Sequence, residues 1–89
     1  MSHDVAFSKN AAEQIRKLDG FTRRMLYGWI DKQLDGIDDP RSLGGPLTGD
    51  AKGLWRYRVG NYRIISHIED DGLVILVVQA GHRSRIHDR

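Results

Sequence analysis

The sequence predicts a single α+β domain in which an N-terminal strand and a two-helix hairpin pack on one face of a small, mainly antiparallel sheet. Apolar residues recur at helical spacing before Pro40, whereas aromatic and arginine residues alternate from Gly53 to Ile65. An unbroken apolar run follows at Leu73 to Val78. This change of period predicts strand, helix, helix and then three meandering strands. A chain of 89 residues supports one modest core, so residues 1–89 are expected to form one domain.

The first strand and the first helix are both short. Residues Asp4 to Phe7 alternate polar and apolar side chains, which is typical of a strand. Ser8 follows as a candidate N-cap, and apolar residues then recur every three or four positions from Lys9 to Leu18. Gly20 suits the C′ position that ends a helix, so we expect the first helix to end before it.

The second helix is longer and starts after a candidate cap at Thr22. Its buried face is predicted to consist of Leu26, Trp29, Ile30, Gln33, Leu34 and Ile37. Gly28 inside this helix costs about 1 kcal/mol relative to alanine, and a close approach of the first helix would offset that cost. The helix is expected to end at Asp38-Asp39-Pro40, because the residue before proline disfavours the α region. A loop then runs to Gly53.

The stretch from Gly53 to Ile65 predicts a β-hairpin with a charged face. A two-residue loop at Gly60-Asn61 would pair Val59 with Tyr62, Arg58 with Arg63, Tyr57 with Ile64 and Arg56 with Ile65. Three arginines then share one face, and two of them lie directly opposite each other. Like charges in this position destabilise a hairpin by roughly 0.2–1 kcal/mol, so folding alone gives no reason to collect them. An anionic partner that binds the three arginines would give such a reason.

The remaining strands follow from the same alternation. The second hairpin strand continues to Glu69, Asp70-Asp71-Gly72 marks a turn, and the apolar run after it predicts a central strand ended by Gly81. The residues expected to face the helices are Trp55, Tyr57, Val59, Ile64 and Ile68. The residues expected on the opposite face are Arg56, Arg58, Arg63, Ile65 and His67.

Composition narrows the functional classes. Residues 1–51 carry seven Lys/Arg and eight Asp/Glu, a balance of −1, whereas residues 52–89 carry seven and four, a balance of +3. The basic character therefore lies with the strands, which favours a surface that binds a polyanion. The chain has no cysteine, no apolar run of membrane-spanning length and no signal-peptide pattern, so we expect a cytoplasmic protein without a membrane partner.

Two interpretations of the arginine face remain open from the residues alone. It is either a solvated sheet face with ion pairs to Glu69, Asp70 and Asp71, or a site where guanidinium groups bind phosphate. The tail favours the second, because Gly81-His82-Arg83 adds a guanidinium and an imidazole near the same edge. Lys52, in the loop GDAKG, is placed to reach a phosphate backbone.

The histidines do not indicate a metal site. His3 is expected at a disordered end, and a lone strand residue such as His67 is more often a surface or packing residue than a catalyst. His82 and His87 are better placed, but their spacing fits no metal site and there is no carboxylate cluster. Nucleotide-binding glycine motifs and a nucleophile elbow are also missing, so we expect neither metal nor cofactor.

The segments PLTGDAKGLWRYRVGNYRIISHI and LVILVVQAGHRSRIH, after a helical hairpin, resemble RelE/ParE-superfamily toxins of bacterial toxin–antitoxin systems. The resemblance covers nearly the whole chain and is strongest to the RelE-like branch. It implies the microbial RNase-like RelE fold and a ribosome-dependent, metal-independent endoribonuclease. Such an enzyme cleaves mRNA in the ribosomal A site, leaves 2′,3′-cyclic phosphate and 5′-hydroxyl ends, and inhibits translation.

The resemblance also implies roles for individual residues. Arg56 and Arg58 occupy paired basic positions that bind RNA and assist in activating the 2′-hydroxyl, while Arg63 and Arg83 occupy phosphate-contacting positions. His87 stands where many members have a tyrosine acid, and His82 is a second candidate acid. The candidate catalytic residues are Arg56, Arg63, Arg83, His87 and His82, and the candidate RNA-binding residues are Lys52, Arg58 and Arg85. Ser66 replaces a common tyrosine, which reduces the expected stacking capacity.

The implied partners are a cognate antitoxin with an acidic, helical neutralising segment, and the ribosome with its mRNA. Two other functions stay open. A ParE-like toxin of similar fold inhibits DNA gyrase through protein contact, and a decayed toxin only binds its antitoxin. The four arginines favour the ribonuclease, whereas the missing tyrosines favour a decayed toxin.

Overall fold

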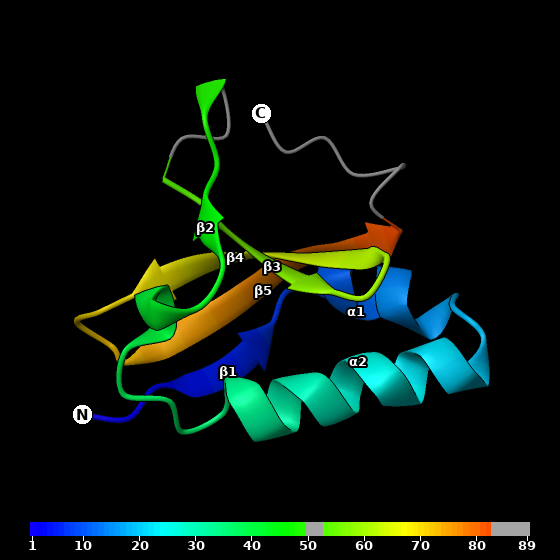
Figure 1. The fold of residues 1–89 in the computed structure, drawn as a ribbon, viewed down its shortest axis with the longest axis horizontal. Helices are drawn as coiled ribbons and strands as arrows, with labels where there is room; N and C mark the ends of the chain where they lie inside the picture. The colour runs from blue at the N-terminus through cyan, green and yellow to red at the C-terminus, as the bar shows by residue number, and fades with distance from the viewer. Residues whose placement is uncertain (50–52, 83–89) are drawn as a thin grey trace.

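The structure, a computed structural model, describes residues 1–49 and 53–82. Two helices and a 3-10 turn accompany a five-stranded sheet of order β1-β5-β4-β3-β2 (Figure 1). The elements are β1 Asp4–Phe7, α1 Lys9–Arg16, α2 Gly20–Gln33, η1 Pro40–Ser42, β2 Gly45–Pro46, β3 Trp55–Val59, β4 Tyr62–Glu69 and β5 Val74–His82. The predicted α+β class is confirmed. None of the helices in these two ranges is long and apolar enough to cross a membrane.

The sheet is mixed, because β1 runs parallel to β5 while the other neighbours are antiparallel. The parallel pair arises because α1, α2 and the two hairpin strands intervene between β1 and β5, and β5 returns in the direction of β1. The two-residue strand β2 was not predicted. It lies inside the stretch expected to be a loop and pairs with Arg56 and Trp55.

The boundary between the helices differs from the prediction. Ser8 caps α1 as expected, its Oγ accepting the Ala11 N–H at 3.0 Å. However, α1 ends at Arg16, and Gly20 is the first residue of α2 instead of a C′ glycine. The cap of α2 is Asp19, whose carboxylate accepts the Thr22 N–H at 3.1 Å and its hydroxyl at 2.6 Å. Asp19, and not Thr22, is the N-cap, because the N–H and the hydroxyl of Thr22 both donate to the Asp19 carboxylate.

The core forms where α1 and α2 cover one face of the sheet. Its buried cluster consists of Ala11, Leu26, Ile30, Leu34, Tyr57, Val59, Ile64, Ile75 and Val77. Burying these side chains is the main driving force for the fold. Three details of the predicted second helix are wrong. The helix ends at Gln33 and not at Asp38-Asp39-Pro40, Gln33 is exposed, and no atom lies within 4 Å of the position that a Cβ on Gly28 would occupy. Gly28 therefore does not serve close packing of the helices within this chain.

A bulge interrupts the pairing of β4 with β5. Ile65 pairs with Gln79 and Ser66 pairs with Val77, so Val78 is an extra residue on β5. The Val78 carbonyl accepts hydrogen bonds from Ser8 Oγ at 3.4 Å and from Asn10 Nδ2 at 3.2 Å, both at the start of α1. Because side chains alternate along a strand, the extra residue reverses the facing of everything after it. Strand β5 also continues through Gly81, which was predicted to end it.

His3 is part of the fold, and the prediction of a disordered, incidental residue is wrong. Only 4% of it is exposed. Its backbone N–H donates to the Ile37 carbonyl at 2.9 Å, and its carbonyl accepts the Gly36 N–H at 2.8 Å. Its Nε2 lies 3.4 Å from Asp70 Oδ1. These contacts attach the residue before β1 to the segment after α2 and to the β4–β5 turn.

Candidate functional site

The β3–β4 hairpin presents the arginines in the predicted register. Arg58 pairs with Arg63, and Arg56 pairs with Ile65. Because alternate residues of a strand share a face, these three arginines lie on the face opposite the helix-covered one. Arg58 is exposed, while Arg56 and Arg63 are half-buried. We call this surface, defined by Arg56, Arg58 and Arg63, the arginine face.

Strand β3 is held in place from its other face by two aromatic residues. The Trp55 indole N–H donates to the Leu43 carbonyl at 2.7 Å, and the Tyr57 hydroxyl donates to the Pro40 carbonyl at 2.7 Å. Burial raises the pKa of Tyr57 to about 12, so its hydroxyl stays a donor. The Trp29 ring packs 5.9 Å from the Tyr57 ring. The arginine face therefore rests on a strand whose position is fixed by one buried and one partly buried side-chain hydrogen bond.

Arg63 is the central arginine of the sheet. It lies opposite Arg58 on one side and opposite Gly81 on the other. Because Gly81 has no side chain, the described part of β5 places no side chain beside Arg63 at this pairing position. A phosphate with several oxygens needs such space next to a guanidinium group.

The acidic residues near the hairpin have other partners. Asp70 accepts a hydrogen bond from Arg41 Nη1 at 3.1 Å, and this contact holds the pKa of that carboxyl below its usual range. Glu69 Oε1 lies 2.8 Å from His67 Nε2. The His67 side chain is exposed on the same side of the sheet as the arginine face. These contacts give His67 a surface role, as expected, and occupy two of the carboxylates that were candidates to neutralise the arginines.

His82 and Ser66 lie away from the arginine face. His82 pairs with Tyr62, and their rings meet edge to face with centroids 5.4 Å apart. Tyr62 packs against the core, so His82 is on the helix-covered side of the sheet. The bulge at Val78 causes this, because without the extra residue His82 would share a face with Arg63. Ser66 is fully buried on the same side, where its hydroxyl donates to the Trp55 carbonyl at 3.3 Å.

Four candidate residues, Lys52, Arg83, Arg85 and His87, lie outside the described residues. Their roles stay predictions from the sequence. Within residues 1–49 and 53–82, no group of three or more His, Cys, Asp or Glu side chains is arranged to hold a metal ion.

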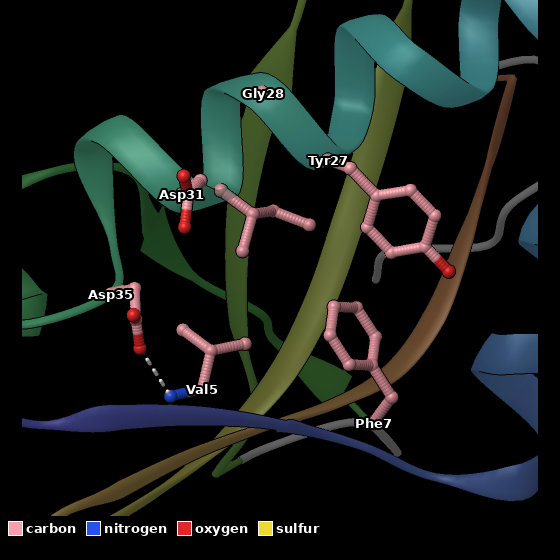
Figure 2. Close-up of a pocket in the computed structure, with 7 residues that line it drawn as sticks. Val5, Phe7, Tyr27, Gly28, Asp31 and Asp35 are labelled. Carbon is pink, nitrogen blue, oxygen red and sulfur yellow. Dashed lines mark hydrogen bonds between the residues drawn. The ribbon is translucent and has the colours of Figure 1, made fainter.

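Sequence reasoning missed a second surface, around α2. A groove of about 420 Å³ separates α2 from β1, and Val5, Phe7 and Tyr27 line it (Figure 2). Asp31 on α2 and Asp35 in the turn after α2 also line it, and the Asp35 carboxylate accepts the Val5 N–H at 3.2 Å. We call it the acidic groove. Gly28, which the sequence analysis attributed to close packing of the two helices, lies at this surface instead.

Comparisons with known proteins agree on one family. The family model described as the ParE toxin of the type II toxin-antitoxin system, parDE, matches residues 5–87. The chain is 26% identical over 90 residues to Toxin RelG of Mycobacterium tuberculosis, and this alignment covers 100% of both chains. It is 27% identical over 82 residues to Toxin RelE of the same organism, covering 92% of this chain and 82% of that protein.

Solved structures show the same fold. A chain in the crystal structure of the toxin-antitoxin complex RelBE2 from M. tuberculosis superposes with a TM-score of 0.84 at 23% identity, covering 93% of this chain and 100% of that chain. A double arginine-to-alanine mutant of the E. coli toxin RelE in the free state gives a TM-score of 0.71 at 23% identity, covering 96% and 88%.

Proposed function

Because the chain belongs to the family of ParE toxins of type II toxin–antitoxin systems, within the RelE/ParE superfamily, we propose that it is a ribosome-dependent endoribonuclease that cleaves mRNA in the A site. The observation that carries this proposal is the arginine face, with Arg58 directly opposite Arg63 and with strand β3 held by the hydrogen bonds of Trp55 and Tyr57. Such an arrangement destabilises the hairpin and suits a phosphate whose negative charge grows in the transition state. The names of its relatives, RelG and RelE, also support the RelE-like branch.

The proposed reaction needs only general acid–base catalysis and charge neutralisation. The 2′-hydroxyl loses its proton to a base and attacks the adjacent phosphorus. The new 2′-O–P bond forms as the P–O5′ bond breaks, and an acid gives a proton to the departing 5′-oxygen. The products are a 2′,3′-cyclic phosphate and a 5′-hydroxyl.

Each arginine has a proposed part in this reaction. Arg56 and Arg58 bind the RNA and assist in activating the 2′-hydroxyl, and Arg63, together with Arg83, stabilises the charge on the phosphorane. Lys52 and Arg85 bind the RNA backbone. Because His82 packs on Tyr62 on the opposite side of the sheet, the proposal favours His87 as the acid.

A second candidate function follows from the description of the matched family, which is the ParE toxin. A ParE-like toxin would inhibit DNA gyrase by protein contact and would not need the arginine face as a catalytic site. Two assays on one purified sample separate the candidates. In the first, programmed ribosomes with A-site mRNA are mixed with the protein and the RNA ends are mapped. In the second, gyrase supercoiling is measured.

We expect cleavage of ribosome-bound mRNA, no cleavage of the same RNA without ribosomes, and normal supercoiling. Intact mRNA together with blocked supercoiling would replace the ribonuclease with the gyrase inhibitor. A protein inactive in both assays that still binds its antitoxin would be a decayed toxin.

A further inference from the structure

The side of α2 that faces away from the core is exposed. The helix buries Thr22, Leu26 and Ile30, and it lies at the edge of the molecule with the sheet on one side of it (Figure 1). Four exposed residues on its other side are spaced by three, four and three positions, so they share one face of the helix. These residues are Phe21, Arg24, Gly28 and Asp31, and we call them the outer face of α2.

Phe21 makes the outer face partly apolar. It is 72% exposed, which is the largest exposed fraction of any aromatic residue that the structure describes. It lies seven positions, about two helical turns, before Gly28. Removing an aromatic ring from water stabilises a contact between proteins, so covering Phe21 would favour association through this face.

Gly28 lies in the middle of the outer face. Glycine inside a helix is unfavourable relative to alanine. Packing within the described chain does not require it here, because a Cβ would meet nothing within 4 Å. A glycine does allow another backbone to approach closely. Gly28 therefore suits a point where a second helix crosses α2.

The two charges of the outer face lie on either side of Gly28. Arg24 is four residues before it and Asp31 is three residues after it, so they lie about 6 Å and about 4.5 Å from it along the helix axis. Within residues 1–49 and 53–82, neither side chain makes an ion pair or a hydrogen bond with another residue. Both charges are therefore available to a partner with the opposite order of charge.

A second copy of α2 has the opposite order of charge when it runs antiparallel to the first. If the two helices cross at Gly28, Arg24 of each copy lies at the height of Asp31 of the other, and two ion pairs form. A parallel crossing would instead place like charges against each other. Lys32 is one position from Asp31, which is about 100° around the helix, so it lies to the side of this contact.

From these observations we infer that the chain forms a symmetric homodimer in which two α2 helices cross antiparallel at Gly28. Arg24 and Asp31 form reciprocal ion pairs, and Phe21 of each copy is covered by the end of the other α2. A two-fold contact of this kind is closed, so association stops at two copies. One helix face from each copy makes a small interface, so the dimer exchanges with the monomer. The inference does not rest on the proposed function, because the arginine face lies on the other face of the sheet and stays open in both copies.

Charge reversal tests the pairing by analytical ultracentrifugation of the full chain. The average mass of the parent should rise from one chain toward two as its concentration rises. Arg24→Asp or Asp31→Arg alone should raise the Kd of the dimer about tenfold or more, because the two-fold symmetry makes two repulsive pairs from one substitution. The two substitutions together should restore the parental Kd, and the control Lys9→Asp on α1, which changes the net charge as Arg24→Asp does, should leave it unchanged. A parent that stays monomeric at every concentration, or a combined variant that dimerises no better than the single reversals, would overturn the inference.

A cysteine at the crossing point tests the geometry independently. The chain has no cysteine of its own, and a residue on a two-fold axis lies next to its own copy. Under mild oxidation, Gly28→Cys should therefore form a disulfide-linked dimer about tenfold faster or more than Ala12→Cys, at an exposed position on α1. Gly28→Leu should keep the fold, because the position is exposed, but should lose the dimer, because its side chain separates the two helices. Equal cross-linking rates, or a Gly28→Leu protein that dimerises like the parent, would refute a crossing at Gly28.

Discussion

Arg63 is the arginine whose removal should matter most for cleavage. It lies between Arg58 and Gly81 in the middle of the sheet, where it can contact a phosphate on the arginine face. Arg63→Ala should slow single-turnover cleavage on programmed ribosomes by ~10²-fold or more, the scale for losing a stabiliser of transition-state charge. The fold should survive, because the change also relieves the repulsion with Arg58.

Circular dichroism checks that the Arg63→Ala protein is folded, and Arg16→Ala is the matched control. Arg16 is an exposed arginine on α1 that pairs with Glu13 at 2.8 Å, far from the candidate catalytic residues in sequence. Parent-like cleavage by a folded Arg63→Ala protein would remove Arg63 from the mechanism.

The candidate acid at position 87 makes a pH-dependent prediction. The ordinary pKa of histidine is about 6.5 and that of tyrosine is about 10, so a histidine acid loses its proton nearer to neutral pH. The cleavage rate should fall as pH rises through the imidazole pKa. His87→Ala should slow cleavage and flatten this alkaline limb, and His87→Tyr should restore activity with the limb at higher pH. If His87→Ala keeps the parental rate and pH profile, the acid must be another group.

At the scale of the elements, Tyr57 couples the β3 strand to the loop at Pro40. Its folded pKa of about 12 lies above the ordinary value of 10, because burial disfavours the phenolate. A raised pKa of this kind contributes stability that is fully present below about pH 10 and is lost as pH rises toward 12. The free energy of unfolding should therefore fall steeply above pH 10.

Tyr57→Phe tests this coupling. The variant should be less stable at neutral pH by about 1–3 kcal/mol, because the Pro40 carbonyl loses a buried donor. It should also lose the part of the alkaline slope that belongs to Tyr57. Urea titrations at neutral pH and between pH 10 and 12 measure both effects, and Tyr27→Phe, at an exposed tyrosine, is the control. An alkaline slope that is the same in Tyr57→Phe and the parent would show that another group causes it.

The sequence predicted the elements whose signals are local. The alternation around Gly60-Asn61 determined the hairpin register, and the alternation at Asp4 to Phe7 determined β1. The helix boundary was missed because Asp19 and Thr22 both suit a cap, and the choice depends on the hydrogen bond between them. Strand β2 was missed because a strand of two residues is too short to show an alternating pattern of polar and apolar side chains.

The facing of His82 shows why part of the candidate site was beyond sequence reasoning. A single extra residue at Val78 moves it to the other side of the sheet. The bulge is stabilised by Ser8 and Asn10, which lie about seventy positions away in the chain. No local sequence pattern therefore predicts it. The three hairpin arginines, in contrast, share a face because nothing interrupts the alternation in β3 or the start of β4.

At the scale of the whole molecule, the two faces of the sheet have different roles. Helices α1 and α2 cover one face and bury the core against it. The arginine face points away from these helices and is proposed to bind mRNA. Binding of mRNA at the arginine face therefore needs no change in the packed core.

The proposed function leads to a cellular prediction. Expression of the chain without a partner should arrest growth through translation, with mRNA cleaved at A-site positions and no induction of the DNA-damage response. Ribosome profiling, mRNA end mapping and a DNA-damage reporter measure these effects in one set of cultures. An induced reporter with intact mRNA would assign the toxicity to gyrase, because cleavage of A-site mRNA leaves the chromosome undamaged.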